Sequence, residues 1–318
     1  MPSVLVCGST AIDLIGHYQG SFAKYQVQYQ VEALNFSLQL ADLRSSFGGC
    51  GINIAYGLKK LGADCIPLSA AGKNFRDHYE DHLLALGINI DHIVVDESFP
   101  QCATAVVISD DHGNQITAFY AGASVSDKRK LPSVIPEISA CTFAVLAPEQ
   151  APIMLRQARD LNRLNIPIFF DPGQCLTEFN KQETRELLSL AQYTMVNDYE
   201  FEILQKISDF SQKKIESMMR QIIVTRGAEG VDIYEGGKHQ HVDAAPAEKI
   251  LDPTGCGDAF RAGYIYGVTA KHDAIRCGRL GNLMAVQNLR SPETQKYDID
   301  ETRLNSAYET MYPESGIR

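Results

Sequence analysis

The sequence predicts an α/β fold with three layers, in which helices cover both faces of a mainly parallel central sheet, and a small β-sheet forms a lid. Short continuous apolar runs alternate with helical segments from about residue 62 onward, which is typical of parallel strands buried on both faces. Two other regions alternate apolar and polar residues, which is typical of strands with one wet face. Since no internal repeat, linker or low-complexity tract interrupts the chain, we expect residues 1–318 to form a single domain.

The strands expected in the central sheet are short apolar runs that end at glycine or a polar residue. They cover residues 3–8, 67–72, 143–146, 166–170, 193–196 and 222–224. The expected helices cover residues 54–61, 75–86, 151–164, 181–190, 258–269, 272–288 and 300–311. A further hairpin is expected around Gly236-Gly237, with His239 and His241 on one side of its second strand, where we assign them no role.

The lid is expected from two regions, about 14–46 and 98–122. In the first, Tyr25, Val27, Tyr29 and Val31 alternate with glutamines, and Phe36, Leu38 and Leu40 repeat the period of two. In the second, residues 103–108 and 115–120 alternate in the same way and are joined by Asp110-Asp111-His112-Gly113-Asn114, which predicts a hairpin.

Composition narrows the class of protein. The chain has 318 residues, 45% of them hydrophobic, and a net charge of -10, which argues against non-specific binding to nucleic acid or to acidic membranes. Its one short basic run, Lys128-Arg129-Lys130, is expected in a solvated turn. No apolar stretch reaches the ~18 residues of a membrane span, and the first residues do not resemble a signal peptide. The eight cysteines include no C-x-x-C pair, so we expect reduced thiols and a cytoplasmic protein.

The segment Asp252–Tyr264, DPTGCGDAFRAGY, carries the chemistry that we expect. Gly255 and Gly257 flank Cys256 and permit a tight turn that exposes backbone N–H groups at the start of a helix. Such a helix start binds anions and suits a phosphate. Asp258 follows in the first turn, where a carboxylate beside a transferable phosphoryl group can act as a general base. The alternative is an ordinary N-capping aspartate.

Other polar residues follow the expected strands, at the sheet edge where ligands bind in open α/β folds. Asp13 comes shortly after the first strand, although a solvated turn aspartate explains it equally well. Asn197, Glu200 and Thr225 follow two later strands. The glycine-rich turn Gly48-Gly49 leads to Asn53, and on spacing alone an ordinary helix start is the favoured interpretation there.

Several competing motifs carry less weight. His78 and His82 have a spacing that can bind zinc on a helix, but no third ligand is evident, so an exposed amphipathic helix is favoured. Cys256 at a helix start has no histidine nearby to act as its base. We find no P-loop, no protein-kinase motifs and no G-x-G-x-x-G, which argues against those nucleotide-binding classes.

Taken together, these motifs resemble a known family. DPTGCGDAFRAG resembles the carboxyl-terminal signature of the ribokinase/PfkB family of carbohydrate and nucleoside kinases, and Gly48-Gly49-x-x-x-Asn53 resembles its amino-terminal signature. Asn197-x-x-Glu200 and Thr225-Arg226-Gly227 resemble its N-x-x-E and T-x-G motifs. The order and spacing fit over nearly the whole chain, and the details are most similar to a bacterial branch described as adenosine kinases. The resemblance implies a ribokinase-like fold.

The resemblance also implies a role for each matching residue. Asp258 would be the base that deprotonates the primary hydroxyl of the substrate, and Gly255, Cys256 and Gly257 would form the anion hole. Substrate binding would involve Asp13, Gly48, Gly49, Asn53 and Phe119. The ATP site would involve Asn197, Glu200, Thr225, Gly227, Asp252 and Asn282. Mg²⁺ would be held by Glu200 through water, and a role for a monovalent cation is left open.

The resemblance therefore implies ATP-dependent phosphorylation of the 5′-hydroxyl of a nucleoside, adenosine first, in purine salvage. Phe36, Phe119 and Tyr120 would stack on the base or else pack the sheet of the lid. A sugar kinase of the ribokinase or fructokinase type is the alternative, followed by a non-catalytic sugar or nucleoside sensor. Two departures from the family pattern are Cys256 in place of the commonest alanine, which should leave the chemistry intact, and Tyr120-Ala121-Gly122 in place of aromatic-Pro-Gly, which bears on the geometry of the lid. By analogy we also expect a homodimer through the lid.

Overall fold

The computed structural model describes residues 3–23, 37–112, 114–247 and 250–313. Its centre is a nine-stranded sheet in the order β13-β12-β11-β10-β9-β8-β1-β4-β5. The strands are β1 (Ser3–Cys7), β4 (Cys65–Ala71), β5 (Ile93–Val95), β8 (Cys141–Leu146), β9 (Ile168–Phe170), β10 (Tyr193–Asn197), β11 (Gln221–Thr225), β12 (Val231–Glu235) and β13 (Lys238–Val242). Neighbours pair in parallel from β11 to β5, whereas β12 and β13 form the antiparallel hairpin predicted around Gly236-Gly237. The predicted parallel sheet is confirmed.

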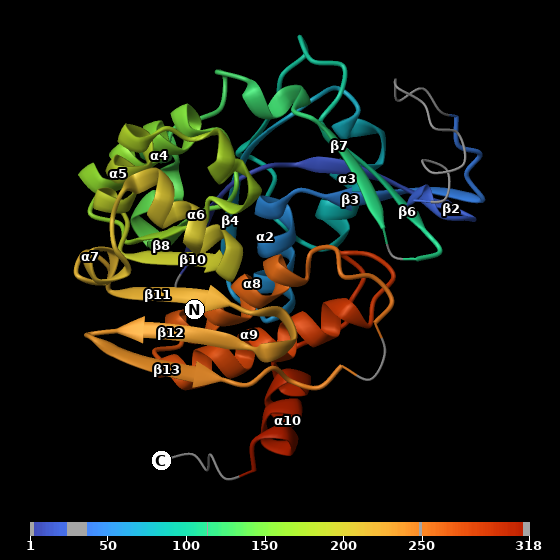
Figure 1. Cartoon of the computed structure of the whole chain (residues 1–318). Helices are drawn as coiled ribbons and strands as arrows, with labels where there is room; N and C mark the ends of the chain where they lie inside the picture. Colours follow the sequence, from blue (N-terminus) through green and yellow to red (C-terminus); the bar gives the residue numbers. More distant parts are fainter. Residues whose placement is uncertain (1–2, 24–36, 113, 248–249, 314–318) are drawn as a thin grey trace.

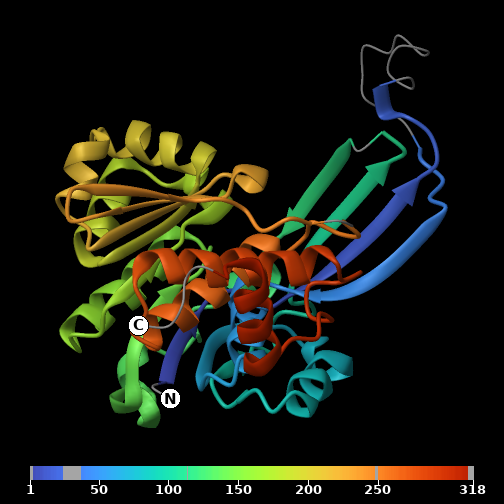
Figure 2. The same cartoon turned by 90° about the horizontal axis from the view of Figure 1, so that it is seen from below.

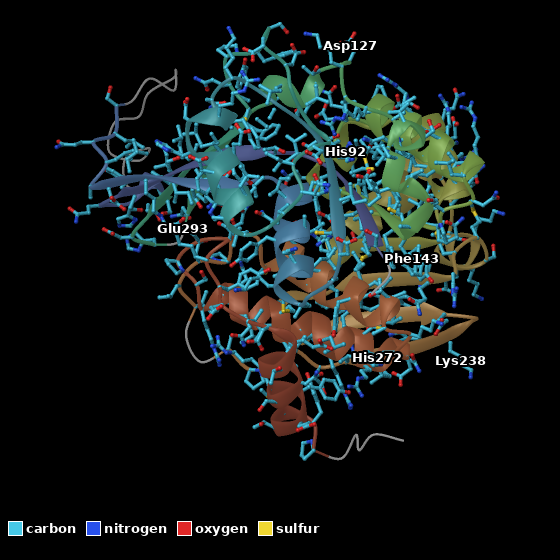
Figure 3. The ribbon with its side chains drawn as sticks, turned by 180° about the vertical axis from the view of Figure 1, so that it is seen from behind. His92, Asp127, Phe143, Lys238, His272 and Glu293 are labelled. Carbon is cyan, nitrogen blue, oxygen red and sulfur yellow. The ribbon has the colours of Figure 1, made fainter. Side chains whose placement is uncertain are left out.

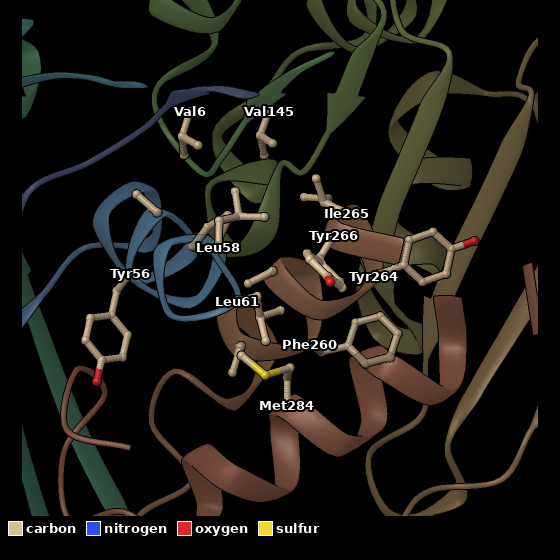
Figure 4. Close-up of a cluster of buried hydrophobic side chains, with 14 of the residues drawn as sticks. Val6, Tyr56, Leu58, Leu61, Val145, Phe260, Tyr264, Ile265, Tyr266 and Met284 are labelled. Atoms are coloured by element: carbon tan, nitrogen blue, oxygen red, sulfur yellow. The ribbon is translucent and has the colours of Figure 1, made fainter. Parts of the chain in front are cut away.

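Helices cover both faces of this sheet (Figure 1). One face carries α2 (Cys50–Lys60), α3 (Phe75–Ala85), α8 (Cys256–Thr269), α9 (Ala274–Leu289) and α10 (Glu301–Met311). The other carries α4 (Ala151–Arg163), α5 (Lys181–Leu190), α6 (Asp198–Ser208) and α7 (Gln212–Glu216). Since side chains alternate along a strand, Val4 and Val6 of β1 enter the first core, and Leu5 and Cys7 enter the second. In the first core, Figure 4 shows Val6 and Val145 above Leu58 of α2 and Ile265 of α8.

A smaller, four-stranded sheet projects from the body (Figure 2). Its order is β3 (Asp42–Gly48), β2 (Ala11–Tyr18), β6 (Ala103–Asp110) and β7 (Gln115–Tyr120). The predicted hairpin of β6 and β7 is confirmed, and β2 joins the two halves by pairing antiparallel to β3 and parallel to β6. Of the strands predicted in the first lid region, residues 25–31 and Phe36 lie outside the described residues, and Leu38 and Leu40 belong to no strand. We call this sheet the lid.

Two helices begin earlier than the sequence predicts. Helix α2 starts at Cys50, directly after the glycine-rich turn, and α8 starts at Cys256, between the two glycines. Glycine is a poor helix former, so sequence reasoning placed it in the preceding loop. Gly51 is nevertheless helical because α2 packs closely on β1: a Cβ at Gly51 would lie 2.8 Å from the Cα of Gly8. Within the described residues, no helix is long and apolar enough to cross a membrane.

Candidate active site

A cavity of about 670 Å³ lies at the carboxyl ends of the central strands, under the lid. Strand β1 lies between β4 and β8, so the chain winds outward in opposite directions from this point of the sheet. In open α/β sheets such a switch point is where ligands bind. Ser9, just past β1, and Glu149, just past β8, line the cavity, together with residues of the lid and the first turn of α8. The cavity therefore lies where the sequence placed the site.

The mouth of α8 supplies backbone donors to this cavity. Gly255 is the N-cap residue and has a left-handed φ of 77°, which costs glycine little. The N–H of Cys256 donates to the Pro253 carbonyl at 3.2 Å. The N–H groups of Gly257 and Asp258 donate to no acceptor among the described residues. N–H groups without an acceptor and the positive end of a helix dipole are features that favour an anion.

Asp258 lies in the same turn and is held from α2. Its Oδ2 accepts a hydrogen bond from Asn53 Nδ2 at 2.8 Å, and Asn53 Oδ1 in turn accepts one from Gln295 Nε2 at 2.8 Å. The bond from Gln295 fixes which way the Asn53 amide faces, so a donor points at the carboxylate. Burial raises the pKa of Asp258, and the charge of Arg261 and the hydrogen bonds from Asn53 and Cys50 oppose that increase. A buried carboxylate with a raised pKa can still accept a proton.

A buried ion pair that the sequence did not reveal lies beside Asp258. Arg261 follows one turn later in α8, is buried, and donates from Nη2 to Asp171 Oδ1 at 2.7 Å. Burial raises the pKa of Asp171 to about 7, with Arg261 acting in the opposite direction. A Cβ at Gly257 would lie 2.9 Å from Arg261 Nη1, so the guanidinium lies directly against the anion-binding turn. An arginine inside an apolar helical run was the signal that could have revealed it.

Asp13 lies in lid strand β2, rather than in the turn that was its alternative interpretation. Its side chain lines the cavity and is buried. Burial and the nearby charges of Asp258 and Asp252 raise its pKa to about 7. Gly48 packs against it, since a Cβ there would lie 2.2 Å from Asp13 Oδ2. The structure thus brings Asp13, Gly49 and Asn53 to one side of the cavity, next to Asp258.

The residues predicted to bind ATP divide into two groups. Asn197, Glu200, Thr225 and Gly227 all line the cavity. Asn197 and Glu200 form a capping box at the start of α6, with reciprocal hydrogen bonds of 2.7 and 2.8 Å, so the N-x-x-E motif has a structural role as well.

Two other predicted ATP residues do not line the cavity. Asp252 is an ion-pair partner of Arg44 at 2.9 Å, and Asn282, buried in α9, donates to the Asp243 carbonyl at 2.8 Å. Phe119 does line the cavity, half-exposed on β7, but its neighbour Tyr120 does not, because alternate side chains of a strand face opposite ways.

The run Lys128-Arg129-Lys130 was expected in a solvated turn, and this prediction is wrong for Arg129. Arg129 is buried and paired with Glu149, and its Nη2 donates to Glu149 Oε1 at 2.7 Å. Charge alone suggested a solvated turn, but the guanidinium is needed because Glu149, with its raised pKa, is buried beside the cavity. His82 is also less exposed than predicted, since it stacks on Phe47 with ring centroids 4.5 Å apart. In the described part of the chain, no three His, Cys, Asp or Glu residues gather as a metal site.

Known proteins share this arrangement. The chain is 30% identical over 282 residues to a nucleoside kinase of Methanocaldococcus jannaschii, covering 88% of each protein. The structure of a nucleoside kinase of Burkholderia thailandensis in complex with inosine is similar over 98% of this chain and 99% of that one, with 31% identity and a TM-score of 0.87. A structure of the same kinase with ADP-inosine has a TM-score of 0.84.

The pfkB family of carbohydrate kinases matches residues 1–301, so the match spans the lid, the central sheet and the mouth of α8. The ribokinase-like fold implied by the sequence motifs is confirmed by these similar structures. The chain belongs to the pfkB family of carbohydrate kinases, and is a phosphotransferase that acts on an alcohol group.

Proposed function

We propose that this protein is an ATP-dependent nucleoside kinase that phosphorylates the 5′-hydroxyl, with adenosine as the preferred substrate. One observation supports it most: Asp258, held by Asn53, lies in a helix turn where two N–H groups donate to no acceptor of the described residues. A base and an anion site one residue apart suit the transfer of a phosphoryl group to a hydroxyl. The two structures with inosine and with ADP-inosine come from a kinase 31% and 32% identical to this chain.

In the proposed reaction, Asp258 takes the proton of the 5′-hydroxyl as that oxygen attacks the γ-phosphate. The N–H groups at the mouth of α8 bind the charge on the transferring phosphoryl oxygens, and Arg261 behind Gly257 adds positive charge there. Asp13 would accept hydrogen bonds from the vicinal hydroxyls of the ribose, and Asn53 would donate hydrogen bonds to them. Closure of the lid would exclude water and so suppress hydrolysis of ATP.

Magnesium would be held at Glu200. Glu200 Oε2 accepts the Asn197 N–H, which leaves Oε1 for a water of the ion. This single carboxylate fits Mg²⁺, which usually keeps several waters and binds one or two carboxylates plus the phosphates of the substrate. When bound, the ion would offset negative charge on the phosphates of ATP.

The lid supports a nucleoside over a free sugar. Ile15, Ala105, Val107 and Phe119 present apolar surface to the cavity from three lid strands, and a flat base would bury that surface. A free sugar would leave it uncovered. The fructokinase alternative keeps support from a Klebsiella pneumoniae enzyme that is 25% identical over 239 residues, so the choice between the two substrates needs a direct test.

A coupled assay that measures ADP release with adenosine, inosine, ribose and fructose tests the proposal. We expect the highest kcat/KM with adenosine, then inosine, because both offer a base to the apolar face of the lid. Phosphorylation of fructose without activity on either nucleoside would contradict the proposal. Tight binding of adenosine without consumption of ATP would instead support the sensor alternative.

The lid also bears on assembly. All residues of β7 are exposed, and β7 is an edge strand of the lid sheet. Exposed edge strands pair readily with other strands, and Ile116 and Tyr120 add apolar surface there. We therefore propose a homodimer through the lid, which sedimentation analysis of the chain and of an Ile116→Lys variant would test: a dimer is expected for the first and a monomer for the second.

A further inference from the structure

A second cavity, of about 930 Å³, lies at the opposite edge of the central sheet. Its walls are the first residues of β8, β10 and β11, the end of α8 and the start of α9. No residue lines both this cavity and the one that holds Asp258. Figure 3 shows two residues of its wall, Phe143 of β8 and His272 between α8 and α9, on the face seen from behind.

Positive charge gathers in this cavity, although the whole chain carries a net charge of -10. Four permanent cations line it, against two carboxylates, Glu235 and Asp273. Both carboxylates already accept hydrogen bonds, Glu235 from Gln221 Nε2 at 2.9 Å and Asp273 from the Arg276 N–H at 2.8 Å. The cations come from three places in the fold and are Arg220, Lys271, Arg276 and Arg279.

None of these four cations forms an ion pair with a carboxylate of the described residues. Arg276 in addition has a buried Nε without a hydrogen-bond partner there. The cavity thus offers several charged donors to an anion.

The remaining wall is aromatic. Tyr193 and Tyr308 are buried at its base, and the half-buried ring of Phe143 meets that of Tyr193 edge-on at 6.0 Å. The guanidinium of Arg220 lies 5.8 Å from the Tyr193 ring centroid, and that of Arg276 lies 4.8 Å from the Tyr308 ring centroid. Charged donors therefore stand next to flat apolar surfaces, and both could contact one ligand.

We propose that this second cavity binds a nucleotide, that is, a small molecule that joins phosphate to a flat ring. Its volume lies within the ~300–1,000 Å³ that is usual for ligand pockets and far exceeds what inorganic phosphate would fill. An uncharged nucleoside would leave the four cations without an anion. Phosphate groups on the cations and a base on the aromatic wall satisfy both halves of the cavity. This site is separate from the proposed reaction and does not depend on it.

A fluorescent reporter inside the cavity tests the proposal. The chain has no tryptophan, so Phe143→Trp places its only indole on the aromatic wall. This variant is titrated with AMP, with adenosine and with inorganic phosphate. We expect a saturable change with AMP, no change with adenosine, and phosphate binding at least ~10-fold weaker because it lacks the ring. Equal responses to phosphate and AMP would show a simple anion site and overturn the nucleotide assignment.

Charge reversal at the exposed rim shows whether the AMP response comes from this cavity or from the one under the lid. Adding Arg220→Glu and Lys271→Glu to the reporter should weaken the AMP response by about 100-fold, since each charge-assisted hydrogen bond contributes roughly tenfold. Arg163→Glu with Lys213→Glu changes the same charge at exposed positions outside the cavity and should leave the response intact. A response that survives the first pair would come from elsewhere and would overturn the proposal.

Equilibrium dialysis with labelled AMP tests the same point without the reporter. We expect the unaltered chain to bind one more AMP molecule than the chain that carries Arg220→Glu and Lys271→Glu. Equal numbers of bound AMP in the two proteins would overturn the second site.

Discussion

The cavity around Asp258 and the cavity around Arg276 lie at opposite edges of one sheet. They differ in whether their cations are paired with carboxylates. In the first, the buried cations are paired, Arg261 with Asp171 and Arg129 with Glu149. In the second, none of the four cations is paired with a carboxylate of the described residues. A buried charge needs its partner to be stable, whereas Arg220 and Lys271 are exposed and are solvated until a ligand arrives. The paired cations of the first cavity therefore stabilise the fold, whereas the cations of the second cavity are available to a ligand.

Helix α8 links the two cavities. Its first turn carries the N–H groups of Gly257 and Asp258, which donate to no acceptor in the described part of the chain. Its last residues, Val268 and Thr269, line the other cavity. The negative end of the helix dipole lies at that second end, where Lys271 offsets it. Both ends of the helix thus favour an anionic ligand. Backbone donors do so at the start of the helix, and cationic side chains do so at its end.

The two cavities should differ most in how much stability is lost when one cation is removed from each. Arg261→Gln leaves Asp171 buried without its partner, and we expect it to lower the free energy of unfolding by about 3–5 kcal/mol. Arg220→Gln in the other cavity removes an exposed, unpaired cation and should cost about 0–1 kcal/mol. Urea denaturation of both variants measures this. Similar losses would show that the two sets of cations do not differ as described.

A second difference should appear with pH. The pKa of Asp13 is raised to about 7 in the folded state. Between the ordinary pKa of an aspartate and this value, the folded state holds a proton that the unfolded state has lost. Stability from this group is therefore present at low pH and is lost as pH rises toward 7. Asp13→Asn removes the titration, so its free energy of unfolding should exceed that of the wild type at pH 8 by on the order of 3 kcal/mol.

Urea denaturation at pH 4 and at pH 8 checks this expectation. At pH 4 the side chain is mostly protonated in the folded wild type, so the two proteins should differ much less there. A difference that is the same at both pH values would mean that Asp13 is not the titrating group.

A smaller effect should distinguish glycines with the same backbone conformation. Gly255→Ala and Gly62→Ala both place a Cβ at a left-handed φ, 77° and 75°. Only at Gly255 would that Cβ meet a neighbour, Thr294 Cγ2 at 2.6 Å, because Gly62 faces open space. We expect Gly255→Ala to cost about 2 kcal/mol more than Gly62→Ala and to lower kcat by moving the anion-binding turn. Equal stabilities and equal kcat values would remove the special role of this turn.

The smallest expected effect concerns the lid over the first cavity. Phe119 lines that cavity and Tyr120 faces away from it. Phe119→Ala should raise KM for adenosine by roughly tenfold through the loss of a ring contact, with little change in kcat, and Tyr120→Ala should leave KM unchanged. Steady-state kinetics of the two variants measures this. Equal KM values would mean that Phe119 does not contact the base.

The sequence predicts the central sheet well because its strands are buried on both faces and appear as short apolar runs. It does not reveal β2 as a strand, since Ala11–Tyr18 is only partly buried and its partners come from β3 and β6, far along the chain. Asp258 was singled out because it follows a glycine-rich turn, whereas Asn53 was assigned a role only through the family resemblance. Arg261 was not singled out, because its partner Asp171 lies 90 residues away and only the fold brings them together.

In the proposed reaction, Asp258 acts as the base beside the first turn of α8. The most direct test of this role is the turnover of Asp258→Asn with adenosine and ATP, measured together with the affinity for each ligand. We expect a kcat lowered by at least ~100-fold, the low end of general-base effects, with both affinities retained, since the amide keeps the size of the side chain. Turnover close to that of the wild type would contradict it.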